Sequence, residues 1–339
     1  MANSDRRWAL IVPVHGLYLT EIVNREFRVD RVLFVHRDKL PYVRKRLGFG
    51  IRVSELKKET PVGKEFFERS PAYAVVRGTG TQEEVEQQLL ELVREELSLL
   101  TLSQLGYSNR RRMGPIVPAG EASLASVNYM VCRLPDMTGR WVGKRTGPIN
   151  EMRIDKLWKD HQDRTFFTKL LKILRGETKV SGSWRKELRR ASVLLGESVG
   201  SDDPFKSFLW NMVALEMLLT RNEKGEMREI LPKKVEALIG WSPFWQEGGY
   251  EERIRDAYDK RNRLLHQGRR DEVTAQDLAF LDHILVNVLA NLVSLPKLFR
   301  SKDDVLAFPK RLEAERILGV RRPRSRPKRH FKRPVDPDF

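Results

Sequence analysis

Residues 250–268 of the chain read YEERIRDAYDKRNRLLHQG, and this stretch combines a helical pattern with side chains that can carry chemistry. Its apolar residues recur at the spacing of one helix face: Ile254, Ala257, Tyr258, Leu264 and Leu265. Arg261 occupies a place in the same stripe, so a guanidinium should lie on the face that packs against the protein. A glycine, Gly268, follows the last residue of the pattern, and glycine there ends many helices. The stretch therefore predicts a helix that ends at Gly268, with His266 in its final turn.

Three polar side chains gather in the second half of this predicted helix: Arg261, Asn262 and His266. Histidine titrates near neutral pH, which suits proton transfer, and Asn262 lies one turn before His266, where its amide can orient the imidazole. Arg261 points about 140° away from His266, so one helix alone cannot close both around one phosphate. A second copy related by a two-fold axis would bring two of each residue to one seam, and we therefore expect a homodimer. The alternative is an arginine whose aliphatic part packs on the bundle, beside a solvated histidine.

The neighbouring segments extend the pattern beyond this helix. FLWNMVALEMLLT (208–220) is followed by a polar turn, by ILPKKVEALIG (230–240), by AYDKRNRLLHQG (257–268) and by a long apolar segment. This succession resembles the HEPN domain, particularly its Apea-like branch, over residues 160–299. The family pattern is Arg, then a polar Asn, Asp or His, then three further residues and His. Arg261, Asn262 and His266 fill this pattern.

The resemblance implies an activity and also an alternative to it. Many HEPN proteins are metal-independent endoribonucleases with a composite site in a dimer, which act in host defence or in toxin-like growth control. Here His266 would accept the ribose 2′-hydroxyl proton, Arg261 would neutralise the phosphorane, and the product would be a 2′,3′-cyclic phosphate, without a cofactor. Other members bind nucleotide or nucleic acid without cutting it. That alternative stays open, as does the role of a pure interaction scaffold.

One carboxylate, Glu216, interrupts the apolar residues 213–219. A carboxylate at such a place costs free energy unless a cation pairs with it, and Arg261 is the natural candidate. A purely structural role, in which Glu216 anchors Arg261 or a backbone amide, is an equal alternative. We expect Glu216 and Tyr258 to support the site.

Length and charge indicate two domains and an anionic partner. A chain of 339 residues exceeds the size at which one core usually keeps growing. We predict an α+β protein, with a mixed α/β recognition or sensing domain over 1–150, a HEPN-like helical domain over 151–318 and a basic tail, disordered when free, over 319–339. The formal charge is +17; residues 321–339 hold eight Lys or Arg and two Asp, a net +6, so +11 remains on the rest. This charge favours RNA, although an acidic protein partner or simple solubility would also suit it.

Local patterns predict the order of elements in both halves. The first half should contain strands at 8–14, 27–35 and 72–76, a helix at 39–47, a helix at 82–100 capped by Thr81, and a strand at 127–134 that closes the sheet. In the second half we expect an apolar face over 157–174, a helix over 184–195, and a helix over 205–219 with Asp202 or Asp203 as its cap and Pro204 in its first turn. The first half resembles no family known to us. We expect it to respond to a protein partner or another trigger.

Two basic loops are further candidates for nucleic-acid contact. Arg110, Arg111 and Arg112 precede a Gly-Pro pair, and residues 138–150 place Lys144 and Arg145 among glycines and a tryptophan. Glycine lets backbone amides approach phosphate, and an aromatic ring between cations suits a stacked base. Solvated loops, the second of them a linker at the domain boundary near residue 150, are the alternative. The remaining candidates for RNA contact are Arg263, Arg321 and Arg322.

Several classes of protein are not supported by the sequence. Cys132 is the only cysteine, so there is no internal disulfide and no thiolate metal cluster, and a reducing cytoplasm fits. No two histidines stand four residues apart beside an acid, so we predict no metal site. The apolar run near the N-terminus is too short for a secretory signal, and Asn287 and Asn291 interrupt the apolar helix expected at 284–295. We read that helix as part of a core and expect no membrane span.

Overall fold

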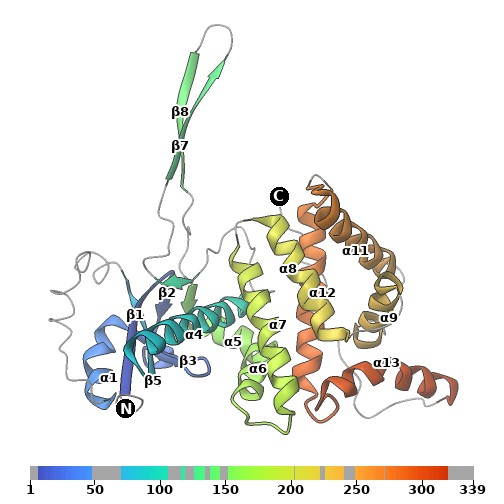
Figure 1. Cartoon of the computed structure of the whole chain (residues 1–339), viewed down its shortest axis with the longest axis horizontal. Helices are drawn as coiled ribbons and strands as arrows, with labels where there is room; N and C mark the ends of the chain where they lie inside the picture. The colour runs from blue at the N-terminus through green and yellow to red at the C-terminus, as the bar shows by residue number, and fades with distance from the viewer. Residues whose placement is uncertain are drawn as a thin grey trace. The chain divides into compact units, whose positions relative to one another are not determined.

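The structure is a computed structural model, which describes residues 7–47, 70–105, 116–118, 126–133, 138–145, 152–201, 203–221, 226–239, 249–270 and 272–319 (Figure 1). The chain forms two compact units, Met1–Leu97 with Arg110–Asp155, and Ser98–Asn109 with Lys156–Phe339. The first contains antiparallel sheet and helix, and the second is helical. The predicted α+β class is therefore confirmed. The limits of 1–150, 151–318 and 319–339 for the domains and the tail stay a prediction.

A five-stranded sheet in the order β3-β4-β5-β1-β6 is the centre of the first unit. Its strands, all antiparallel to their neighbours, are β1 (Arg7–His15), β3 (Glu26–Arg28), β4 (Leu33–His36), β5 (Ala72–Thr79) and β6 (Val117–Pro118). Short 3-10 helices η1 (Glu21–Val23) and η2 (Arg37–Lys39) precede β3 and α1 (Leu40–Leu47). Leu40 and Val43 of α1 pack on Val35 and Tyr73 in one buried cluster. Burial of these apolar side chains holds α1 on the sheet.

Helix α4 (Gln82–Leu102) covers another part of the sheet, and its predicted start is confirmed. Glu84 accepts hydrogen bonds from the N–H and the hydroxyl of Thr81, the residue just before the helix. A Cβ added at Gly78 of β5 would lie 3.2 Å from the side chains of Val85 and Leu89, so a larger residue there would require these side chains of α4 to shift by a few tenths of an ångström.

The predicted single strand over 27–35 is wrong, because the structure places two antiparallel strands, β3 and β4, in this run. The buried carboxylate of Glu96 accepts a hydrogen bond of 2.7 Å from the backbone N–H of Asp30, between the two strands. This long-range contact stabilises a turn that an apolar run does not reveal. Outside the main sheet, β2 (Leu17–Leu19) pairs in parallel with β9 (Met152–Ile154).

The strand predicted at 127–134 does not close the sheet. Strand β7 (Ser126–Arg133) pairs instead with β8 (Thr138–Arg145) in a separate two-stranded hairpin. The expected basic loop at 138–150 is therefore wrong as far as Arg145, because this part is a strand. The sequence did not predict strand β8 because Gly139 and Gly143 lower its strand propensity. For β7, the alternation of apolar and polar residues predicts a strand but not the strand with which it pairs.

The helices of the second unit follow one another along the chain. They are α5 (Lys156–Arg164), α6 (Phe167–Leu174), α7 (Gly182–Gly200), α8 (Pro204–Leu219), α9 (Met227–Ile239), α11 (Tyr250–Gln267), α12 (Ala275–Ser294) and α13 (Lys302–Ile317). Asp203 caps α8 by accepting from the N–H groups of Phe205 and Lys206, as predicted. The single apolar face predicted over 157–174 is wrong, because α5 and α6 are separate helices and Leu157 is 66% exposed. Spacing gives the direction of a side chain but not the break between two helices.

The core of the second unit lies around α12, which contacts both α8 and α9 (Figure 1). Asn287 donates to the His283 carbonyl over 2.8 Å, and Asn291 donates to the Leu238 carbonyl over 3.2 Å. These bonds satisfy the buried amides that interrupt the apolar run. By length and composition alone α12 could cross a membrane, and 72% of its most apolar window is buried inside the protein. That burial matches the expected core helix.

The boundary between the two units falls within α4, after Leu97. Residues 98–105, the last turn of α4 and the turn after it, belong to the helical unit. Trp158 donates to the Ser103 hydroxyl over 2.9 Å, and Gln162 donates to the Ser103 carbonyl over 2.7 Å. A Cβ added at Gly196 of α7 would lie 1.8 Å from the carbonyl oxygen of Ser98. The backbones of α4 and α7 therefore touch at a place where only glycine fits.

Candidate active site on helices α8 and α11

Helix α11 carries the predicted site and ends where the sequence predicts. Gly268 adopts a φ of 67°, which favours glycine, and its N–H donates to the Leu264 carbonyl over 3.1 Å. His266 lies exposed in the last turn. Ile254, Ala257 and Leu264 are buried as expected. Leu265 is 50% exposed, so its expected place on the buried face is wrong. The spacing gives its direction around the helix but not whether another element covers it.

Arg261 and Glu216 form the expected ion pair between α11 and α8. The Nη2 atom of Arg261 lies 3.5 Å from Oε2 of Glu216, with 21% and 20% of the two side chains exposed. Burial raises the pKa of Glu216, and the positive charge of Arg261 opposes this rise. The prediction that a cation lies close to this carboxylate, with Arg261 as the candidate, is confirmed, whereas the choice between a role in the site and a purely structural role stays open.

A second contact shows how the two helices run. The guanidinium of Arg270, just after α11, lies 5.5 Å from the ring of Phe205 at the start of α8. Glu216, the partner of Arg261, lies near the other end of α8. The helices therefore run antiparallel to one another.

Two further side chains hold the Arg261 guanidinium. The side-chain amide oxygen of Asn262, Oδ1, accepts a hydrogen bond of 3.0 Å from Nη1 of Arg261. The ring centroid of Tyr258 lies 5.8 Å from Cζ of Arg261. Tyr258 therefore lies beside the guanidinium, and its supporting role in the site stays a prediction. The bond of Asn262 differs from the expected one, because its amide orients the arginine and not the imidazole. Neighbouring residues point about 100° apart around a helix, but a long arginine can bend back to reach the next side chain.

Two buried polar atoms at this pair lack hydrogen-bond partners within the described part of the chain. They are Nε of Arg261 and Oε1 of Glu216. Buried polar atoms usually have a partner, and such an unmatched donor and acceptor at one ion pair mark a place where a further group can bind. Helix α11 thus carries a restrained, partly exposed guanidinium whose buried Nε–H is unsatisfied and, in its last turn, an exposed imidazole. This set can bind an anion and transfer a proton.

Arg263, predicted to contact nucleic acid, is engaged in an ion pair. Its Nε donates to Oε2 of Glu272, and Arg269 donates to Oε1 over 3.3 Å. The hydrogen bond from Arg263 is the largest cause of a lowered pKa of Glu272. Both oxygens of this carboxylate therefore have partners, whereas Oε1 of Glu216 has none among the described residues.

The other predicted nucleic-acid contacts stay predictions. Arg110, Arg111, Arg112, Arg321 and Arg322 lie outside the described residues. The backbones of Lys144 and Arg145 lie in β8, opposite Val127 and Ser126 of β7.

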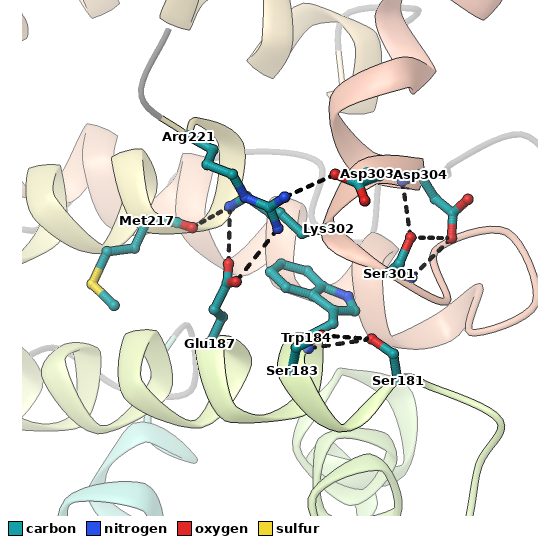
Figure 2. A network of polar contacts seen from close by, with 10 residues as sticks. All are labelled: Ser181, Ser183, Trp184, Glu187, Met217, Arg221, Ser301, Lys302, Asp303 and Asp304. Carbon is teal, nitrogen blue, oxygen red and sulfur yellow. Dashed lines mark hydrogen bonds and ion pairs between the residues drawn. The ribbon is translucent and has the colours of Figure 1, made fainter.

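Sequence reasoning missed a polar network at the C-terminal end of α8, shown in Figure 2. Lys302, only 2% exposed, donates to the Met217 carbonyl, lies 3.7 Å from Oε2 of Glu187, and has its Nζ 5.1 Å from the ring centroid of Trp184. Burial lowers the pKa of Lys302 to about 8, although Glu187 opposes this change. The capping sequence Ser301–Asp304 could have predicted the helix start, but nothing in it signals a buried lysine.

The same network fixes the last turn of α8, the turn that carries Glu216. Arg221 lies 2.9 Å from Oδ1 of Asp303 and 3.6 Å from Oε1 of Glu187. Lys234 of α9 donates to the Leu219 carbonyl over 2.9 Å. Together with Lys302, these contacts satisfy carbonyls that a helix end leaves free. The backbone that presents Glu216 to Arg261 is therefore held by α7, α9 and α13.

No group of three or more His, Cys, Asp or Glu side chains among the described residues could hold a metal ion. Comparison of the chain with protein-family models, with curated proteins and with solved structures finds no match.

Proposed function

We propose that this protein is a metal-independent endoribonuclease of HEPN type that works as a homodimer through its helical unit. The observation that carries the proposal is the Arg261 guanidinium, which Glu216, Asn262 and Tyr258 restrain while its Nε has no partner among the described residues. A fixed guanidinium with an unsatisfied N–H suits a phosphate that gains charge. The positive charge of the whole chain, +17, favours RNA as the substrate.

The reaction requires a base, an acid and a cation. One His266 imidazole takes the proton from a ribose 2′-hydroxyl, and the 2′-oxygen forms a bond to the adjacent phosphorus. The bond from phosphorus to the 5′-oxygen breaks, and this oxygen takes a proton from the imidazolium of the second copy. Arg261 binds the phosphoryl oxygens while charge builds on them. The products are a 2′,3′-cyclic phosphate and a 5′-hydroxyl. As the HEPN resemblance implies, the biological role is host defence or toxin-like growth control.

The requirement for a dimer follows from the helix itself. Five residues separate Arg261 from His266, so the two side chains leave α11 about 140° apart. The exposed Leu265 lies on α11 between them and gives this surface an apolar residue that a second copy can cover. A two-fold axis beside the last turns of α11 would unite one guanidinium with the imidazole of the other copy.

The experiment is a mixture of two inactive variants. We expect Arg261→Ala and His266→Ala each to lower RNA cleavage by a factor of about 10² or more while both stay folded and dimeric. In heterodimers, one half-site keeps an intact Arg261 and an intact His266 from different copies. Co-expression should therefore restore partial activity if one residue of each kind suffices, whereas a need for both imidazoles leaves the mixture inactive but dimeric.

Two results would contradict this proposed function. A fully active protein that sediments as a monomer at the assay concentration would reject the composite site. RNA that is retained but never cut, under any condition, would assign the chain to the non-catalytic HEPN modules that bind nucleotide or nucleic acid.

A further inference from the structure

The Arg261 guanidinium has one edge that is only partly used. Its Nη1 atom donates to Asn262, while Nε has no partner among the described residues and Nη2 has a single contact with Glu216 at 3.5 Å. The Nε and Nη2 atoms form the edge with which arginine grips a carboxylate or a phosphate through two parallel hydrogen bonds. Glu216 lies beside this edge without completing the two bonds.

Glu216 is equally unsatisfied on its own side. Its Oε1 atom is buried and has no hydrogen-bond partner in the described part of the chain. The nearby ammonium groups of Lys302 and Lys234 bind the Met217 and Leu219 carbonyls, so the charge that faces Glu216 from α11 is Arg261. A purely structural ion pair at a buried place would be expected to use both carboxylate oxygens, because buried polar atoms usually have partners.

A second ion pair on α11 provides the comparison. Arg263 and Arg269 occupy Oε2 and Oε1 of Glu272, so that carboxylate is saturated, and its pKa is lowered. The pKa of Glu216 is instead raised, because burial outweighs the effect of Arg261. Both oxygens of Glu272 are thus held by hydrogen bonds. Glu216 makes only one contact of 3.5 Å with Arg261, so an anion that accepts two hydrogen bonds from the guanidinium can replace it.

We propose that Glu216 competes with the substrate phosphate for the Nε–Nη2 edge of Arg261, and so sets the affinity of the site for RNA. In the free protein Glu216 holds the guanidinium. Nε is buried in the free protein, so a phosphate reaches both N–H groups only when the carboxylate turns away, or takes up a proton and releases the guanidinium. This inference rests on the proposed function only in naming RNA as the anion, because the competition itself requires no cleavage.

The test measures binding of a single-stranded 2′-O-methyl RNA oligonucleotide, which lacks the attacking hydroxyl, by fluorescence anisotropy. If Glu216 holds Arg261 about nine-tenths of the time, Glu216→Gln should tighten binding about tenfold, because the competent fraction rises to near one. Arg261→Ala should weaken binding. Glu252→Gln removes one negative charge from an exposed position of α11 and is the control for a general electrostatic gain, which we expect to stay below about twofold. Circular dichroism and sedimentation check that each variant is folded as the wild type is.

A second measurement uses pH. Acidification from pH 7.5 to 5.5 should tighten binding more in the wild type than in Glu216→Gln, because the wild-type carboxyl takes up a proton as the pH falls towards its raised pKa. Binding by Glu216→Gln that is unchanged, or as weak as that of Arg261→Ala, would overturn the proposal and make Glu216 a support of Arg261. Wild-type affinity in Arg261→Ala would also overturn it. Tighter binding by Glu216→Gln without cleavage of unmodified RNA by any variant would keep this inference and reject the endoribonuclease.

Discussion

Replacement of Lys302 by methionine tests whether a buried ammonium group holds the end of α8. Methionine has a similar length and no charge, so Lys302→Met removes the contacts with Met217 and Glu187 (Figure 2) while it keeps most of the buried volume. Glu187 stays in the variant and keeps its contact with Arg221, while the Met217 carbonyl loses its donor. We therefore expect the two proteins to differ in how their free energy of unfolding depends on pH.

The size of the pH-dependent change in the free energy of unfolding follows from the pKa of Lys302 in the folded and in the unfolded chain. Its pKa is about 8 in the folded protein, against an ordinary value of 10.5. At pH 7 the amine is protonated in both the folded and the unfolded chain, so the cost of burying the charge is fully present. Between pH 8 and 10.5 the folded protein loses this proton first, and its free energy of unfolding rises with pH. From pH 7 to 10 the wild type should gain about 2 to 3 kcal/mol relative to Lys302→Met.

The assay is urea unfolding of both proteins at pH 7, 8.5 and 10, followed by the helical circular dichroism signal. The exposed Lys297, in the turn before α13, provides the control, because Lys297→Met should shift all three values equally. A difference between the wild type and Lys302→Met that stays constant with pH within about 0.5 kcal/mol would refute a buried lysine with a lowered pKa.

Two other predictions concern packing and RNA binding. Gly196→Ala should destabilise the helical unit by about 3 kcal/mol or more in urea unfolding, because its Cβ would lie 1.8 Å from the Ser98 carbonyl oxygen. Gly182→Ala on the same helix is the control, because its Cβ would meet nothing within 4 Å, and it should be neutral or stabilising. Deletion of residues 321–339, which hold eight Lys or Arg, should lower the salt dependence of RNA affinity, since each phosphate neutralised in a single strand contributes about 0.7 to the slope. An unchanged slope would assign the tail to solubility.

Local chemistry made several features predictable from the sequence. Asp203 and Gly268 mark helix ends because a capping carboxylate and a glycine with positive φ act on neighbouring backbone groups. The pairing of Glu216 with Arg261 was predictable for a different reason. A carboxylate within an apolar helix face needs a cation, and α11 offers an arginine on its own packed face.

The features that the sequence did not reveal depend on distant partners. The β7–β8 hairpin and the division of residues 26–36 between β3 and β4 depend on which strand pairs with which, and alternation does not carry that information. Likewise, the burial of Lys302 results from α7 and α8 meeting the first turn of α13. The exposure of Leu265 shows the reverse case, in which an apolar residue at the right spacing has no covering element among the described residues.

Cleavage of end-labelled RNA in the presence of EDTA tests the central claim most directly. We expect the wild type to cut RNA in chelator and to leave 2′,3′-cyclic phosphate and 5′-hydroxyl ends. Arg261→Ala and His266→Ala should each lose this activity by a factor of about 10² or more. Cleavage that appears only after a divalent ion is added, or that persists at the wild-type rate in His266→Ala, would contradict this claim.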